Sequence, residues 1–186
     1  EVRRYRLARI QTELVRQNLA GIILYDQLNT RYATDSTNMQ IWCSHNEARY
    51  VYVPADSPAI IFEFGGKPLL TEGLPGIERV LKPKTFFYMS AGQHVTQRAV
   101  AWGAEMDAII RERSGGNQRI AIDRIAPVGV QVMEQLGYKI HDGFTIMEKA
   151  REIKSAGEIA LMRKSIEVCE LAVQRMHEVL KPGITE

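Results

Sequence analysis

Carboxylates mark the ends of three sequence runs that predict strands, namely Asp26, Glu63 and Asp123. Three converging carboxylates can hold Mg²⁺, which activates water for the cleavage of nucleic acid. The first candidate function is therefore a stand-alone magnesium-dependent nuclease. Acids at strand ends also serve as turn formers and helix caps, so the alternative interpretation gives all three a structural role.

Cys43 and His45 offer a second chemistry, since a thiol and an imidazole can act as a nucleophile and its base. No third group is evident that would orient the imidazole, and a zinc site would need a second pair of ligands. The segment Gly65-Gly66-Lys67 is similar to a phosphate-binding loop, but Ile61 stands where that motif has its first glycine, and Pro68 replaces its hydroxyl residue. We interpret this segment as a turn, and we do not interpret Cys43 and His45 as a catalytic pair.

The composition is that of a folded globular protein. Of 186 residues, 45% are apolar and 25% are charged, which excludes a disordered chain, a collagen-like repeat and a disulfide scaffold. No run approaches the ~20 apolar residues of a membrane span, and the polar first residues do not form a signal segment, so no membrane partner is expected. Cys43 and Cys169 lie far apart in the sequence, which favours a reducing compartment. We therefore expect a cytoplasmic protein.

Positive charge gathers at the start of the chain, although the net charge is only +2. The first segment carries arginines at positions 3, 4, 6, 9 and 16. A basic helix can contact nucleic acid, but no aromatic residues are interleaved with these arginines and no basic stripe follows elsewhere. We expect a solvated or subunit-facing helix surface and no nucleic-acid partner.

Strand-like and helical segments alternate along the first 150 residues. Short apolar runs with turn residues between them predict strands, and apolar residues at spacings of three and four predict helices. Because a turn at 55–58 joins two strand-like runs, these runs are expected to form an antiparallel hairpin. The predicted fold of residues 1–150 is α/β, with a mixed sheet flanked by helices. The expected strands cover residues 22–25, 49–54, 59–64, 85–89, 119–123 and 138–141, and the expected helices cover 3–19, 94–113, 127–136 and 144–153.

The segment 151–186 has a different pattern. Ser155 and Glu158 match a capping box, in which each side chain satisfies a free amide at the start of a helix. Apolar residues then recur at spacings of three and four as far as Leu180, and the sequence at 181–183 ends the helix. Such a long apolar stripe needs a partner surface. It could pack on the first domain or pair with a second copy, but the interpretation that we prefer is the first helix of a truncated second domain.

Two sets of residues resemble the creatinase, prolidase and aminopeptidase P superfamily of metallopeptidases. One set is similar to the first helix of its pita-bread catalytic domain, and the other is similar to the N-terminal domain that precedes it. Their order and their separation, about one domain length, extend the resemblance over nearly the whole chain. The similar residues are 154–159, 162–163 and 180–186 for the helix, and 6–7, 20–24 and 29–34 for the N-terminal domain.

The resemblance implies that this chain is a non-catalytic N-terminal domain of a metal-dependent hydrolase of the creatinase or Xaa-Pro peptidase type, which caps the substrate pocket and mediates dimerisation. In the family, two divalent metal ions are held by two aspartates, a histidine and two glutamates, all of which would lie beyond Glu186. No catalytic residue, metal ligand or bound cofactor is therefore expected in this chain.

The implied partners are the missing catalytic domain, a second copy in a homodimer, and a small-molecule or dipeptide substrate. An alternative follows from residues 31–46, which look most similar to the branch that contains the dimethylsulfoniopropionate lyases. Those enzymes keep the pita-bread fold but eliminate rather than hydrolyse. In that case the chain would be the N-terminal domain of a lyase.

The family's N-terminal domain carries a loop, after an Asn-x-Arg-Tyr motif, that reaches toward a substrate pocket, often that of the partner subunit. The resemblance places Trp42, Cys43, His45, Asn46 and Arg49 in this loop. An aromatic wall beside a cation or an imidazole can hold a small charged substrate. A sulfonium or quaternary ammonium group would favour Trp42 through cation–π attraction.

The residues expected to bind substrate are Trp42, His45, Arg49 and Arg31. The alternative interpretation makes Trp42 a partly buried packing residue and Arg49 a surface charge beside a strand. In the same interpretation, Arg31 joins Asn29 and Tyr32 as a structural brace at the sheet edge.

Overall fold

The computed structural model describes residues 1–66 and 68–185; Lys67, which belongs to the turn expected at 65–67, and Glu186 lie outside the described residues. The chain divides into two compact units, one of residues 3–152 and one of residues 153–186 together with residues 1–2. Gly65 has a φ of 75° within the short 3-10 helix η1 (Phe64–Gly66), as a turn at this place requires.

Six strands form one sheet in the first unit: β1 (Gly21–Leu24), β2 (Tyr50–Pro54), β3 (Ala59–Phe62), β4 (Ile77–Leu81), β5 (Arg119–Ile122) and β6 (Lys139–Asp142). Their order is β4-β3-β2-β1-β5-β6. β2 is antiparallel to both β1 and β3, and the other neighbouring pairs are parallel. The predicted mixed sheet and its antiparallel hairpin are thus confirmed.

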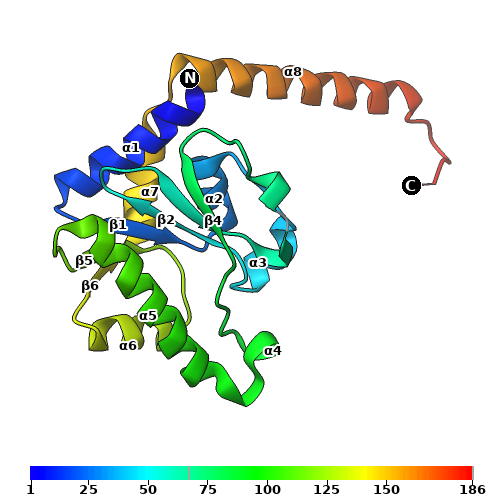
Figure 1. Ribbon diagram of the computed structural model, residues 1–186. Helices are drawn as coiled ribbons and strands as arrows, with labels where there is room; N and C mark the ends of the chain where they lie inside the picture. The colour runs from blue at the N-terminus through cyan, green and yellow to red at the C-terminus, as the bar shows by residue number, and fades with distance from the viewer. Residues whose placement is uncertain (67, 186) are drawn as a thin grey trace. The chain divides into compact units, whose positions relative to one another are not determined.

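Helices cover both faces of this sheet (Figure 1). Alternate residues of β1 point to opposite sides. Ile23 packs with residues of α5 and α6, whereas Ile22 and Leu24 pack with residues of α1 and α7. Val15 of α1 lies outside both cores and is 65% exposed. The helices that accompany the sheet are α1 (Val2–Arg16), α2 (Gln27–Thr34), α3 (Gln40–His45), α4 (Tyr88–Ala91), α5 (Val95–Ser114), α6 (Pro127–Gln135) and α7 (Gly143–Glu152).

The prediction of a strand at 85–89 is wrong. Phe86 is buried not in a strand but because its ring packs against Trp102, with 5.3 Å between the centroids. The strand at this edge of the sheet is β4, which comes earlier in the chain. Its Glu78 and Arg79 interrupt the apolar run that would have indicated it. Charges on an edge strand are ordinary, because such a strand is only half-buried.

The basic side chains of α1 serve contacts within the first unit. Arg9 donates hydrogen bonds to the backbone carbonyls of Lys149 (2.9 Å) and Ala150 (3.2 Å), at the end of α7. A cation is favoured there because the last carbonyls of a helix carry partial negative charge. Arg3 pairs with Asp35 at 2.7 Å. Internal pairing thus accounts for part of the positive charge at the start of the chain.

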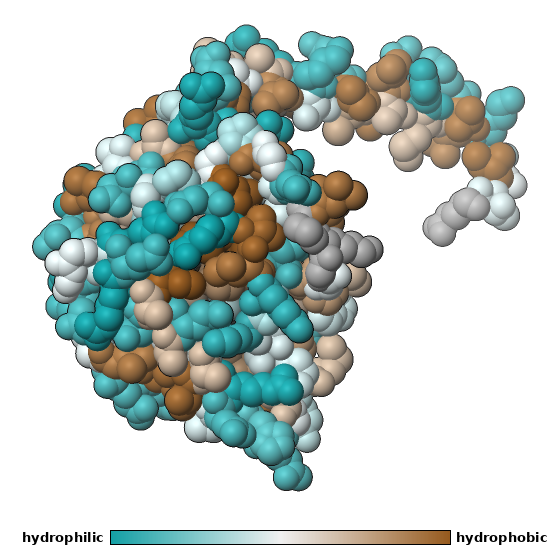
Figure 2. Space-filling model, viewed as in Figure 1, coloured by the Kyte–Doolittle hydropathy of each residue, from teal (hydrophilic) through white to brown (hydrophobic). Residues whose placement is uncertain are grey.

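The second unit is dominated by the long helix α8 (Ala156–Val179). The Ser155 hydroxyl accepts from the amide of Glu158 (3.2 Å), and the Glu158 carboxylate accepts from the amide of Ser155 (2.9 Å), so the predicted capping box is confirmed. Large apolar side chains remain exposed along the helix, and Figure 2 shows them as separate brown areas. They include Ile166 (56% exposed), Val173 (64%) and Met176 (69%).

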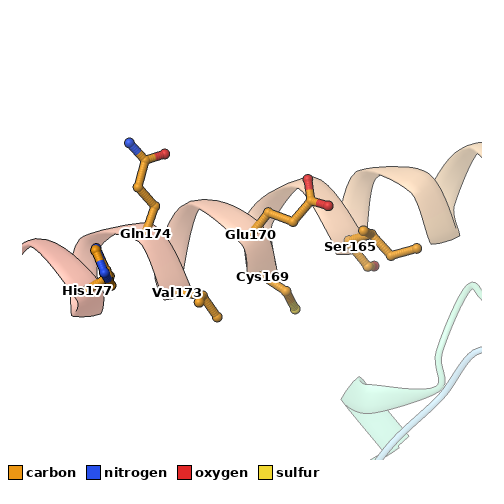
Figure 3. Close-up of a pocket in the computed structure, with 7 residues that line it drawn as sticks. Ser165, Cys169, Glu170, Val173, Gln174 and His177 are labelled. Carbon is orange, nitrogen blue, oxygen red and sulfur yellow. The ribbon is translucent and has the colours of Figure 1, made fainter.

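An open, unenclosed space along α8 is bordered by Ser165, Ile166, Cys169, Glu170, Val173, Gln174 and His177. Cys169 and Val173 point to one side of the helix, whereas Glu170 and Gln174 point to the other (Figure 3). A surface lined by a single helix is open, so the apolar side of α8 is available for packing. Among the described residues, no helix has the length and hydropathy that a membrane crossing requires.

Candidate functional site

Two of the strand-end acids organise the start of α2. The Asp26 carboxylate caps this helix by accepting from the amides of Leu28 (2.9 Å) and Asn29 (3.0 Å). Asp123, at the end of β5, accepts from the backbone amides of Tyr25 (2.7 Å) and Asp26 (3.2 Å). It also accepts from Nδ2 of Asn29 at 3.0 Å. These contacts agree with the structural alternative left open by the sequence.

Burial raises the pKa of the Asp123 carboxyl to about 6, and hydrogen bonds from Asn29 and from backbone amides only partly offset this effect. The folded state therefore binds this proton more tightly than the unfolded state. We expect Asp123 to lower the free energy of unfolding as the pH rises from about 4 to about 6.

A titration of the carboxyl carbons by NMR should give Asp123 a midpoint well above that of exposed aspartates. The Asp123→Asn variant should lose this part of the pH dependence of unfolding. A midpoint for Asp123 at or below about 4, the ordinary value for aspartate, would contradict the expectation.

No metal site is assembled from the described side chains. Among residues 1–66 and 68–185, no three His, Cys, Asp or Glu side chains are grouped as a metal ion would require. Glu63, the third strand-end acid, is paired with Arg49 instead. The nuclease interpretation therefore lacks its magnesium site. The two metal ions implied by the family resemblance likewise do not fit any set of side chains in this part of the chain.

α3 places Trp42 in an aromatic cluster beside an open groove. The indole stacks on the ring of Phe64, with centroids 4.8 Å apart, and meets Phe87 edge-on at 6.2 Å. Trp42 is only half-buried, so part of its ring is accessible. The groove has a volume of about 640 Å³ and is lined by Met39, Gln40, Ile41, Trp42, His45 and Asn46.

Arg49 is fully buried, and its guanidinium is directed at internal acceptors. Its Nε lies 3.1 and 3.0 Å from the two carboxylate oxygens of Glu63. Nη2 donates to the hydroxyl of Ser36 at 2.5 Å, and Nη1 donates to Oε1 of Gln27 at 3.4 Å. The structure thus gives Arg49 internal partners, so the alternative that makes it a surface charge is wrong, whereas the expected substrate contact stays a prediction.

The four expected substrate-binding residues separate into three environments. Trp42 and His45 lie together on the groove, and His45 is exposed. Arg31 is exposed on α2 and is not among the residues that line the groove. The sequence did not indicate that Phe64 and Phe87 complete the aromatic cluster. Both lie in segments that the sequence predicts as strands, 59–64 and 85–89, and this interpretation gives no indication that they contact Trp42.

Asn29 and Tyr32 brace α2, as one interpretation of the sequence expected. Asn29 is fully buried and bonds to Asp123. The hydroxyl of Tyr32 donates to the carbonyl of Ala150 at 3.1 Å. These two contacts connect α2 with β5 and α7, and they fix the segment from which α3 follows.

The two cysteines should differ strongly in reactivity. Cys43 is buried, and this burial raises the pKa of its thiol, whereas Cys169 is exposed on α8. For residues 1–186 alone, we expect one fast-reacting thiol in the native state and two after denaturation, measured with a chromogenic disulfide reagent. The Cys169→Ser variant should lose the fast phase. A fast phase that survives in this variant would show that Cys43 is accessible.

No family model matches the chain. In sequence, the chain is 34% identical over 185 residues to dimethylsulfoniopropionate lyase DddP of Roseovarius nubinhibens, an alignment that covers 100% of the chain and 42% of that protein. In structure, it is similar to the prolidase of Thermococcus sibiricus, with a TM-score of 0.69, 17% identity, and coverage of 98% of this chain and 46% of that one. It is also similar to the N-terminal domain of the peptidase PepQ from Mycobacterium tuberculosis, with a TM-score of 0.51, 12% identity, and coverage of 78% and 98%.

The first unit therefore has the fold of the N-terminal domain of prolidase-type enzymes. Together with its similarity to the lyase along its whole length, this fold agrees with the resemblance expected from the sequence: the chain is similar in sequence to a dimethylsulfoniopropionate lyase and in structure to prolidase-type enzymes. The chain spans 42% of the length of the lyase that it matches.

Proposed function

We propose that this chain is the non-catalytic N-terminal part of a pita-bread metalloenzyme, and that it covers the substrate pocket and contributes to a homodimer. The observation that carries the proposal is the 34% identity over the whole chain to a lyase more than twice as long. The exposed apolar side of α8 supports it, because a helix with such a stripe needs a further surface to pack on. In this proposal α8 is the first helix of the catalytic domain.

The first candidate activity of the whole enzyme is a lyase that acts on a small sulfonium carboxylate. Sequence identity favours this candidate over a peptidase, since the prolidases share the fold at only 17% identity or so. Elimination from dimethylsulfoniopropionate breaks a carbon–sulfur bond, whose electron pair leaves with dimethyl sulfide. The proton beside the carboxylate passes to a base, and acrylate remains. In this proposal the base and the two divalent metal ions belong to the catalytic domain.

The groove on α3 supplies groups that suit such a substrate. The accessible face of Trp42 can attract a sulfonium cation through its π electrons. His45 follows one helical turn later on the same face, and an N–H of its imidazole can donate a hydrogen bond to a carboxylate. Ile41, 82% exposed, and Met39, 56% exposed, form an apolar rim that another surface can cover. We assign this covering surface to the catalytic domain of the second copy.

The second candidate activity is hydrolysis of Xaa-Pro dipeptides, which the structural similarity to prolidases favours. The two activities are distinguished by supplying the full-length protein with dimethylsulfoniopropionate or with a Xaa-Pro dipeptide. Release of dimethyl sulfide supports the lyase, and release of proline supports the peptidase.

A chain of residues 1–186 alone should be inactive in both assays and should bind no divalent metal ions, whereas the full-length protein should bind two per subunit by elemental analysis. Activity or stoichiometric metal binding by residues 1–186 alone would contradict the non-catalytic role. A full-length protein that remains monomeric in analytical ultracentrifugation would contradict the homodimer. The expected cytoplasmic location is also part of this proposal, and fractionation of the source cells tests it.

A further inference from the structure

We propose that Arg49, Glu63 and Asn38 are positioning residues that fix the Trp42 ring at the edge of the groove. The effect on ring position follows from the contacts of the first unit alone. The effect on catalysis rests on the proposed function, in which Trp42 contacts the substrate. The two effects can therefore be tested separately.

The first step is the attachment of the segment 36–38 to a buried ion pair. Arg49 reaches the hydroxyl of Ser36 with Nη2 and its carbonyl with Nη1, at 3.5 Å for the carbonyl. Oε1 of Glu63, which accepts from Arg49, also accepts from Nδ2 of Asn38 at 2.8 Å. The side chains of Arg49 and Glu63 are 0% and 2% exposed, so water does not compete for these bonds.

The second step leads from Asn38 to the aromatic ring. The same Nδ2 of Asn38 donates to the carbonyl of Phe64 at 3.3 Å, and the Phe64 ring is the one on which Trp42 stacks. The next residue, Met39, adopts a left-handed conformation with a φ of 38° and begins α3, where its carbonyl accepts from the amide of Cys43. Asn38 therefore fixes the backbone immediately before α3 and the aromatic partner of Trp42 together.

The Arg49–Glu63 ion pair fixes the orientation of the groups around it more than it raises the free energy of unfolding. Placing two charges in a protein interior costs about as much as their attraction returns, and an apolar pair of similar volume is often equally stable. An arginine paired with a carboxylate, however, has several donors in fixed directions, and in this site they reach β3, α2 and the segment before α3. This geometry specifies where Trp42 lies.

The first experiment measures the position of α3 without any substrate. In a full-length protein in which every cysteine except Cys43 is replaced by serine, the buried thiol of Cys43 reports on opening of α3. Asn38→Ala should raise the rate of Cys43 modification at least about tenfold and should increase quenching of Trp42 fluorescence by iodide. The matched control is Asn117→Ala, which removes side-chain hydrogen bonds elsewhere in the first unit and should leave both rates unchanged. Equal rates for Asn38→Ala and the control overturn the proposal.

Ser36→Ala provides a second variant if Asn38→Ala does not fold. This substitution removes the hydroxyl that accepts from Arg49. It should raise the rate of Cys43 modification and the quenching of Trp42 fluorescence, each by less than Asn38→Ala does. An unchanged rate of Cys43 modification in a folded Ser36→Ala protein also overturns the proposal.

The second experiment measures catalysis by the full-length protein. Asn38→Ala should raise KM severalfold with kcat nearly unchanged, because a misplaced ring weakens substrate and transition-state binding alike. Added to Trp42→Ala, it should cause no further change, since it acts through Trp42. Effects that add in the double variant overturn the positioning role. If Trp42→Ala alone leaves the kinetics unchanged, the proposed substrate contact fails, and the labelling experiment still decides the positioning.

Discussion

Replacing Arg49 with methionine is expected to lower the free energy of unfolding by about 3–5 kcal/mol, because Glu63 would keep a buried negative charge with no cation beside it. The side chain of Glu63, directly after β3, is only 2% exposed. Chemical denaturation monitored by circular dichroism measures the change. A loss below about 1 kcal/mol, the range of an exposed ion pair, would show that the site admits water.

The double variant Arg49→Met with Glu63→Leu separates the two contributions. Removing both charges avoids the unpaired carboxylate, so most of the loss should be recovered. The segment 36–38 would nevertheless lose its hydrogen-bond partners, so Cys43 should react faster in this stable double variant than in the unchanged protein. Recovery of stability without recovery of Cys43 protection is the result that distinguishes positioning from stabilisation.

Replacing Trp42 with alanine is expected to lower kcat/KM of the full-length enzyme by more than tenfold, about 1.4 kcal/mol of transition-state binding. The accessible face of the indole would be lost, and with it the cation–π attraction that we propose for a sulfonium substrate. Steady-state kinetics with dimethylsulfoniopropionate measures the change.

Two variants control for effects on folding. Trp42→Phe keeps an aromatic face against Phe64 and should retain most of the activity. Val100→Ala truncates an exposed apolar residue of α5 and should have no effect. Unchanged kinetics for Trp42→Ala in the folded enzyme would reduce Trp42 to a packing residue.

Most of the sheet could be predicted because its inner strands are continuous apolar runs in the sequence. β1, β2 and β3 are buried at every position, so each is an apolar run bounded by turn residues. The edge strand β4 could not be predicted in this way, since an edge position tolerates charged residues that interrupt the run.

α2 and α3 could not be predicted because they depend on distant contacts. α2 buries polar residues such as Asn29 and Thr30, which are compatible with the interior only because Asp123 and backbone groups accept their hydrogen bonds. A sequence pattern shows apolar periodicity but not such partners.

The groove was predicted only in part, for a related reason. The resemblance drew attention to Trp42 and His45, which the structure places together on α3. The environment of Arg49 depends on Glu63, which is brought beside it only when β2 and β3 pair. Nothing in the local sequence distinguishes an arginine with such a partner from one at the surface.

The connection between β1 and β2 joins two strands that are neighbours in the sheet, although it contains both α2 and α3. Its two ends are therefore fixed at adjacent strands of the sheet. The length and sequence of the connection do not change how these strands pair. We therefore expect that residues 25–48 can be exchanged between relatives as one segment. The exchange should succeed where the recipient retains the partners on which this segment depends, Arg49, Glu63 and Asp123.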